Sequence, residues 1–224
     1  EIGMKEGREV VVQSPFDFRQ QALLILSADA PDPKKHDYVV RVAMATMAII
    51  GQAKGRTLCL FTSYRVLNYV AEFLRREMPE QRILVHGDAP RMKLVAEFKD
   101  DVSSVLLGTE SFWAGVDVPG EACSCVIIDK IPFPNPGDPV LDALNDRCNG
   151  GGFWQVSVPR AVLQLRQGVG RLIRRRDDCG VVVILDNRLV TKGYGHTFVN
   201  SFPPFRRAST LRGNIIERWL RGDR

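Results

Sequence analysis

Short apolar runs alternate with amphipathic segments along this chain, and no other feature limits its fold as strongly. Residues 57–61 (TLCLF) form a nearly continuous apolar run typical of a buried strand, and residues 64–78 carry apolar side chains at helical spacing. A second such pair is expected at 83–86 and 90–99. Further β-rich runs occupy 103–107, 123–129 and 181–185. Strands this apolar, alternating with helices, predict an α/β fold: a parallel sheet with helices on both faces.

Polar side chains follow three of these runs directly, at residues 62–64, 108–111 and 186–188. The right-handed crossover rule places the carboxyl ends of parallel strands along one edge of the sheet. Open α/β sheets bind their ligands at that edge. We therefore expect a binding rim built from these loops.

The segment 131–152 interrupts the alternation. It carries four prolines and then three consecutive glycines at 150–152. Such a stretch predicts a surface excursion rather than part of the core. A length of 224 residues suits one large domain, so residues 1–224 are expected to form a single domain with this excursion.

The charge and hydropathy of the chain limit its partners. Lys and Arg outnumber Asp and Glu by 31 to 26, a mild bias toward polyanionic partners such as nucleic acid or nucleotides. The longest apolar stretch, 39–50, contains Arg41 and is too short to span a bilayer, and no signal peptide is present. We expect a cytoplasmic protein without a membrane partner. Because the chain does not begin with Met, it is expected to be a fragment of a longer protein.

The cysteines predict reduced thiols rather than a metal site. They are odd in number and widely spaced, and no C-x-x-C pair occurs. Cys123 and Cys125 are expected to point to one face of a strand, without further ligands nearby in the sequence. The five positions are Cys59, Cys123, Cys125, Cys148 and Cys179.

Most common catalytic motifs are missing. The chain has no G-x-x-x-x-G-K-S/T phosphate loop, no H-E-x-x-H and no G-x-S-x-G. Its three histidines, His36, His86 and His196, are scattered and are expected to be solvated or hydrogen-bonded rather than to act as bases. Residues 168–173 (GVGRLI) start like a dinucleotide fingerprint, but they lie in a helical pattern instead of following a strand.

An arginine-rich stretch is the remaining candidate for chemistry. If residues 160–175 are helical, Gln167, Arg171 and Arg174 fall on one stripe, opposite the apolar side chains. Gly168 and Gly170 in mid-helix are unfavourable unless something approaches them closely. Arginine forks suit phosphate oxygens. An ordinary solvated basic face explains the same spacing equally well.

Three ordered blocks resemble the C-terminal motifs of superfamily 2 helicases of the DinG/XPD-like family. Residues 60–74 (LFTSYRVLNYVAEFL) resemble motif IV, residues 108–139 motif V, and residues 164–188 (QLRQGVGRLIRRRDDCGVVVILDNR) motif VI. The residues SPF at 14–16 resemble the family's entry into this second motor domain. One departure is Ala114, where many relatives carry glutamate. The resemblance implies a RecA-like domain.

The resemblance also implies roles at a shared ATP cleft. Gln167 and Arg171 would approach the γ-phosphate, and Arg174 would act as the arginine finger. Three further positions would belong to the nucleotide site, and those in motif V would couple it to DNA: Gly115, Asp117 and Gly170. Asp117 also fits a simple loop-capping residue.

A second set of residues would contact single-stranded DNA at the rim. Ser63, Tyr64 and Thr109 are candidates for phosphate contacts, with Tyr64 able to stack on a base. Ser63 fits a helix N-cap equally well. Phe112 and Trp113 are expected in the core more than on a base.

The function implied is that of the second motor domain of an ATP-dependent 5′ to 3′ DNA helicase of DNA repair, in a bacterial or archaeal nucleoid rather than a nucleus. ATP and Mg²⁺ would be shared with a first RecA-like domain, so the fragment alone is expected to be inactive. An iron–sulfur cluster is possible in the parent protein but not in these residues. Two other classes stay open: a non-catalytic nucleic-acid-binding RecA-like module, and a small-molecule enzyme on a similar sheet, for which no base or nucleophile stands out.

Overall fold

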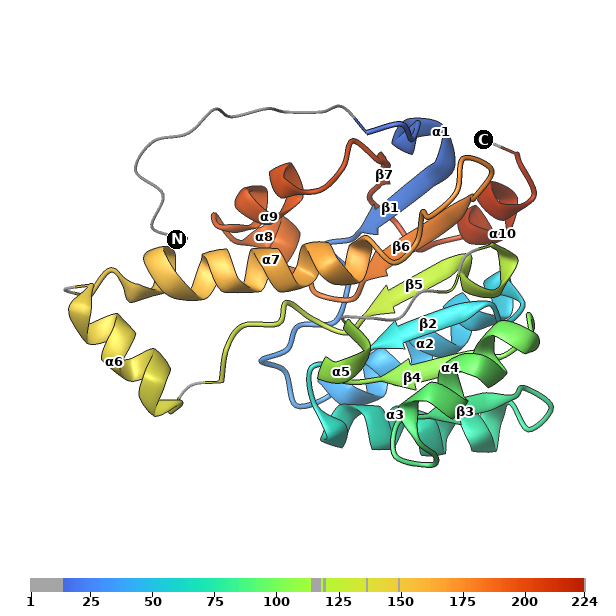
Figure 1. Ribbon diagram of the computed structural model, residues 1–224, viewed down its shortest axis with the longest axis horizontal. Helices are drawn as coiled ribbons and strands as arrows, with labels where there is room; N and C mark the ends of the chain where they lie inside the picture. Colours follow the sequence, from blue (N-terminus) through green and yellow to red (C-terminus); the bar gives the residue numbers. More distant parts are fainter. Residues whose placement is uncertain (1–13, 114–117, 119, 136, 149, 224) are drawn as a thin grey trace.

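The computed structural model describes residues 14–113, 118, 120–135, 137–148 and 150–223. Seven strands form one sheet, and every pairing in it is parallel, in the order β3-β4-β2-β5-β6-β1-β7 (Figure 1). The strands are β1 (Ala22–Leu26), β2 (Thr57–Leu60), β3 (Ile83–Val85), β4 (Val105–Gly108), β5 (Cys125–Ile128), β6 (Gly180–Ile184) and β7 (Arg206–Ala208).

Helices connect the strands and cover the sheet. They are α1 (Phe18–Gln21), α2 (Tyr38–Ala53), α3 (Tyr64–Glu77), α4 (Arg91–Asp100), α5 (Glu110–Trp113), α6 (Pro139–Arg147), α7 (Val158–Val169), α8 (Arg188–Thr191), α9 (Gly195–Ser201) and α10 (Ile215–Leu220). Two short turns precede β5 and α7: the 3₁₀ turn η1 (Glu121–Cys123) and the π turn η2 (Phe153–Ser157).

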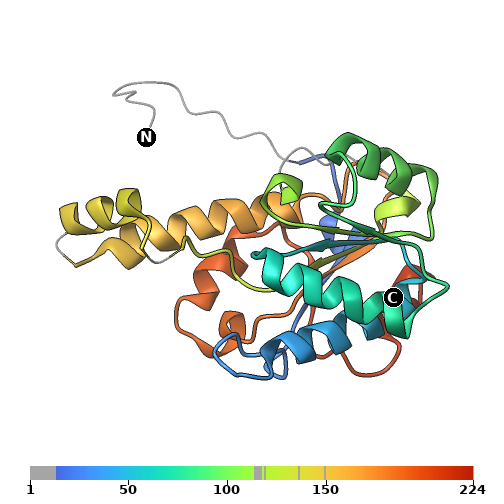
Figure 2. The ribbon, with the colours of Figure 1, turned by 90° about the horizontal axis from the view of Figure 1, so that it is seen from below.

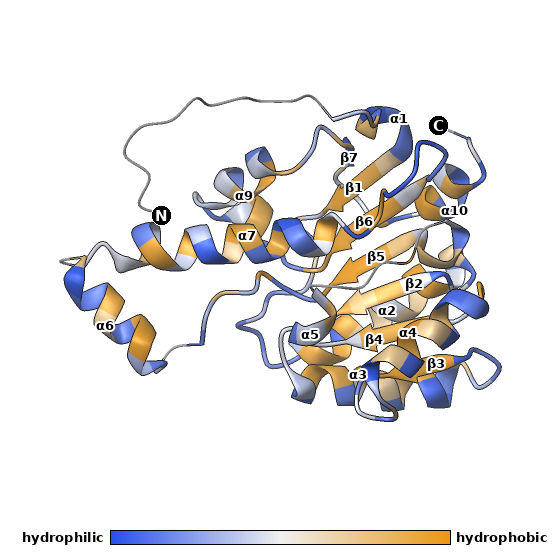
Figure 3. Ribbon diagram, in the orientation of Figure 1, coloured by the Kyte–Doolittle hydropathy of each residue, from blue (hydrophilic) through white to orange (hydrophobic). Residues whose placement is uncertain are grey.

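The core consists of two apolar layers, one on each face of the sheet. Residues of a strand alternate between them: Leu24 of β1 packs in one layer, and Leu23 and Ile25 pack in the other. Helices α2, α3 and α10 cover one face, and α4, α5, α7 and α9 cover the other, as the view along the sheet shows (Figure 2). Apart from the edge strand β7, the strands are almost entirely apolar (Figure 3). The α/β expectation is confirmed.

Helix α3 shows how local sequence sets one of these elements. The Ser63 hydroxyl accepts the Val66 N–H at 3.5 Å, which satisfies one of the free donors of the first turn. Val66, Val70 and Leu74 recur every four residues and are buried against the sheet. The N-cap alternative for Ser63 is therefore confirmed.

Two local expectations are wrong. Cys123 lies in η1, before the strand, so the alternation of a strand does not apply to it. Cys123 and Cys125 pack in different apolar layers rather than on one face. Ile131, at the start of the expected surface excursion, is buried in the core with 2% exposure, because it follows β5 directly.

The part of that segment at 137–148 lies away from the sheet. Helix α6 begins at a proline after Asp138, whose carboxylate accepts the Val140 N–H at 2.9 Å. Together α6 and the first turns of α7 extend beyond the carboxyl ends of the strands (Figures 1 and 2). Within the described ranges, no helix is both long and apolar enough to cross a membrane.

Candidate functional site

The carboxyl ends of three neighbouring strands, β4, β2 and β5, border a hollow of about 290 Å³. This is the edge at which the sequence predicted a binding rim. The hollow is lined by Phe61, Thr62, Ser63, Tyr64, Thr109, Glu110, Trp113, Pro132, Phe133, Pro134, Asn135 and Gln164. All three predicted DNA contacts, Ser63, Tyr64 and Thr109, therefore lie around one hollow.

Tyr64 and Thr109 are joined through His86, which follows β3. The Tyr64 hydroxyl lies 3.2 Å from His86 Nδ1, and Thr109 Oγ1 lies 2.7 Å from the same nitrogen. Burial and the nearby Arg91 cation lower the pKa of His86, because both disfavour a charged ring. The expectation that this histidine is hydrogen-bonded is confirmed. Tyr64 is 53% exposed whereas Thr109 is 4% exposed, so Tyr64 is the accessible end of this network.

Asp129, which follows β5, fixes the loop after β2. Its carboxylate accepts hydrogen bonds from the Thr62 backbone N–H at 3.0 Å and from the Thr62 hydroxyl at 3.1 Å. Full burial raises the pKa of Asp129 to about 7, although Lys130 and the Thr62 donors lower it. Sequence reasoning missed this residue, although an acid at a predicted strand end was a usable signal.

Asp186 holds the third predicted rim loop. Its buried carboxylate is bound by the Arg188 guanidinium, with Nε 2.9 Å from Oδ1, and it accepts the Ile131 N–H at 2.9 Å. The Arg188 guanidinium also lies 5.6 Å from the centre of the Phe133 ring. This pair ties the loop after β6 to the loop after β5.

The arginine stretch is not one continuous helix, contrary to the expectation for residues 160–175. Helix α7 ends at Val169, and Gly170 caps it by donating to the Arg166 and Gly168 carbonyls. Gln167 lies in the last turn of α7, whereas Arg171 and Arg174 lie beyond it, so no helical stripe joins the three. Glycine explains the early end, because it has the weakest helix preference after proline.

Gly168 meets close neighbours from other elements of the fold. A Cβ atom there would lie 3.0 Å from Trp113 Cε3 and 3.1 Å from Leu60 Cδ1. Trp113 is 1% exposed and its indole N–H donates to the Phe61 carbonyl at 3.3 Å. Phe112 is fully buried as well. Both aromatic residues are core residues, as expected.

Asp178 organises the loop that carries the arginines. Its Oδ2 accepts the backbone N–H groups of Arg174 and Arg175, both at 2.7 Å, and its Oδ1 accepts the Gly120 N–H at 3.2 Å. The Gln21 amide donates to the carbonyls of Arg175 and Asp178 at 2.9 and 3.0 Å. The backbone role of Asp178 depends on a turn that the sequence did not reveal.

The arginine loop and the rim lie at opposite ends of the strands. Arg171 remains close to Gln167, because its Nε donates to the Gln167 carbonyl at 3.0 Å. Asp178 lies two residues before β6 begins, so the arginine loop is at the amino ends of the strands. Arg174 and Arg171 also lie close enough to Cys123 to influence its pKa, which burial raises to about 12.

Ala114, Gly115 and Asp117 lie outside the described residues. Within the described ranges, no group of three or more His, Cys, Asp or Glu side chains is placed to hold a metal ion.

Comparisons with known proteins show the family of this chain. The helicase C-terminal domain family matches residues 46–205. The ATP-dependent DNA helicase YoaA of Haemophilus influenzae is 39% identical over 213 residues, covering 94% of this chain and 33% of the relative. The ATP-dependent helicase DinG of Mycobacterium tuberculosis is 40% identical over 202 residues, covering 88% of this chain and 30% of the relative. This chain spans about one third of the length of these relatives.

A solved structure, XPD_APO, has the same fold. It superposes with a TM-score of 0.62 at 20% identity, over 86% of this chain and 40% of the other. The parallel sheet covered on both faces is thus the RecA-like fold. The chain belongs to the helicase C-terminal domain family, as a DinG/XPD-like domain of superfamily 2.

Proposed function

We propose that this domain completes an ATP site whose phosphate loop and Mg²⁺-binding acids belong to a first RecA-like domain of the same protein. The residues present fit half of such a site: the loop after α7 offers arginines, and the described residues offer no carboxylate cluster for a metal. ATP supplies the phosphoryl group, and Mg²⁺ neutralises part of its charge. Gln167 and Arg171 bind near the γ-phosphate, and Arg174 stabilises the charge that develops on it.

The observation that carries this proposal is the backbone clamp at Asp178. An arginine finger contributes to catalysis only when its position is set before the reaction, because reorganisation during the reaction would cost free energy. Asp178 holds the Arg174 N–H at 2.7 Å, and Gln21 holds the following carbonyls. A basic face that is only solvated would not require a buried acid such as Asp178 to hold its backbone.

At the opposite end of the strands, the rim provides part of a single-stranded DNA track. Tyr64 is exposed beside the hollow and is kept in place by His86, so it can stack on a base while nearby polar groups contact phosphates. Opening and closing of the two-domain cleft would move the strand along this track. Movement in the 5′ to 3′ direction is proposed from the family resemblance.

The test joins this chain to the first motor domain of its parent protein and measures DNA-stimulated ATP hydrolysis. Arg174→Ala lowers kcat about 10³-fold or more while DNA affinity stays unchanged. Arg76→Ala, an exposed arginine at the end of α3, is the matched control and retains activity. The 224-residue chain alone hydrolyses no ATP.

Two results would overturn the proposal. Strong ATP hydrolysis by the chain alone would show a complete site within it. Loss of DNA binding in Arg174→Ala, with hydrolysis per bound complex unchanged, would instead favour a non-catalytic nucleic-acid-binding module.

A further inference from the structure

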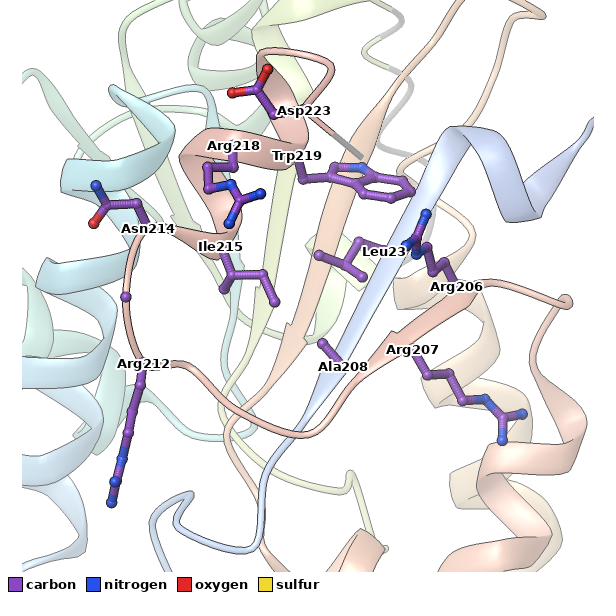
Figure 4. A pocket seen from close by; sticks show the side chains of 11 residues that line it. Leu23, Arg206, Arg207, Ala208, Arg212, Asn214, Ile215, Arg218, Trp219 and Asp223 are labelled. Atoms are coloured by element: carbon purple, nitrogen blue, oxygen red, sulfur yellow. The ribbon is translucent and has the colours of Figure 1, made fainter.

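The outer edge of the sheet carries a second, strongly basic hollow. It has a volume of about 440 Å³ and lies between the edge strand β7 and helix α10 (Figure 4). It is lined by Leu23, Arg206, Arg207, Ala208, Arg212, Gly213, Asn214, Ile215, Arg218, Trp219 and Asp223. Four of these side chains are arginines and one is acidic, so an anion is the ligand that the hollow favours.

The arginines are available for such a ligand. Arg206, Arg207 and Arg218 are exposed, and no acidic side chain of the described residues forms an ion pair with them. Arg212 pairs at 3.6 Å with Asp29, but both side chains are largely exposed, so the pair is weak and is readily exchanged for another anion.

The floor of the hollow positions one of these arginines. The Arg206 guanidinium lies 5.8 Å from the centre of the Trp219 ring, and the Trp219 indole N–H donates to the Gly180 carbonyl at 2.9 Å. Trp219 is 3% exposed, so it offers no face to a base. The hollow therefore suits phosphate groups, which arginine forks bind through paired N–H donors, rather than bases.

The basic surface is longer than a single phosphate needs. A neighbouring hollow of about 480 Å³ shares Arg206 and Arg207 and adds Arg19. In Figure 4, Arg206 and Arg218 lie on two sides of the first hollow, whereas Arg207 and Arg212 extend away from it. A row of arginines over two adjoining hollows matches a chain of phosphates.

We propose that this edge is a second nucleic-acid contact, which binds the phosphodiester backbone through Arg206, Arg207 and Arg218. It is separate from the rim, because β7 lies four strands from β2, or about 19 Å. The inference rests on the proposed function only in requiring that the chain binds nucleic acid. The contact is independent of base sequence and strongly salt-dependent.

The first measurement is the salt dependence of binding to a labelled oligothymidylate, with the 224-residue chain. Arg206→Gln with Arg218→Gln lowers the slope of log affinity against log salt by about 0.7 for each lost phosphate contact. Arg75→Gln with Arg76→Gln, at the other end of the sheet, removes the same charge and leaves the slope unchanged. Arg207→Gln, which does not contact Trp219, serves as a second variant if the first pair unfolds the chain.

The second measurement is protection of arginines from phenylglyoxal, read by mass spectrometry. The oligothymidylate protects Arg206 and Arg218 several-fold, whereas thymidine monophosphate at the same phosphate concentration does not. Equal protection by the monophosphate would overturn the inference in favour of a small phosphorylated ligand. Binding that Tyr64→Ala weakens, without protection of these arginines, would overturn this inference alone. An oligothymidylate that does not bind at all would overturn the proposed DNA track as well.

Discussion

The carboxylate of Asp178 accepts a hydrogen bond from the backbone N–H of Arg174, with 2.7 Å between Oδ2 and N. This contact fixes the turn of the chain after α7, and it therefore fixes the backbone position from which the proposed arginine finger, Arg174, extends. It also anchors the arginine loop to the folded core, because Asp178 is only 8% exposed.

Replacing one of the two acceptor oxygens of Asp178 should destabilise the domain. Asp178→Asn keeps one acceptor oxygen for three backbone donors, so the free energy of unfolding falls by about 1–2 kcal/mol, measured by urea denaturation. Asp177→Asn is the matched control at an exposed neighbour and changes the value by less than about 0.5 kcal/mol. Equal effects of the two variants would contradict the backbone role of Asp178.

Two glycines in helices should respond oppositely to alanine. Gly168→Ala places a methyl group against Trp113 and Leu60, which should cost about 1–3 kcal/mol of unfolding free energy despite the better helix preference of alanine. Gly51→Ala in α2 meets nothing within 4 Å and should stabilise by about 0.5–1 kcal/mol. Thermal denaturation of both variants checks the signs, and stabilisation by Gly168→Ala would show that the contact with Trp113 is loose.

Asp129 should make stability depend on pH. Its pKa is about 7 in the fold against 3.8 for the ordinary group, so between these values the folded state binds the proton more tightly than the unfolded state. Stability therefore falls as pH rises through this window, by up to about 1.4 kcal/mol per pH unit. Asp129→Asn removes that contribution, so its unfolding free energy relative to the parent increases from pH 5 to pH 8. A difference that stays constant with pH would exclude a raised pKa.

Arg188 should be far more important for stability than an exposed arginine. Arg188→Gln leaves the fully buried Asp186 carboxylate without its cation, and the expected cost is roughly 3 kcal/mol. Arg212→Gln breaks an exposed pair and should cost less than about 1 kcal/mol. Chemical denaturation of the two variants gives the comparison, and similar small losses would contradict the structural role of the buried pair.

Five of the seven strands, β2 to β6, followed from apolar runs in the local sequence, whereas β1 and β7 were not predicted. Strand β1 is apolar and fully buried, so its run at 22–26 was a signal that sequence reasoning missed. Strands β2 and β7 show the physical difference between a strand that is visible in the sequence and one that is not. The run at 57–61 is apolar because both faces of β2 are buried, so the strand is visible in the sequence. Strand β7 consists of Arg206, Arg207 and Ala208, whose side chains are exposed or half-buried at the edge of the sheet. An edge strand with little burial carries no apolar signal, and only its pairing with β1 makes it a strand.

The sequence by itself determined the α/β architecture, the rim loops and the family, because buried strands must be apolar and motif spacing is a local property. Tertiary structure decided what the single residues do. Asp129 and Asp178 became backbone clamps because other segments bring unpaired N–H groups to them, and α7 ended at Val169 because Gly170 turns the chain toward Asp178. Such contacts join residues far apart in the chain or across a turn, and no periodicity in the sequence records them.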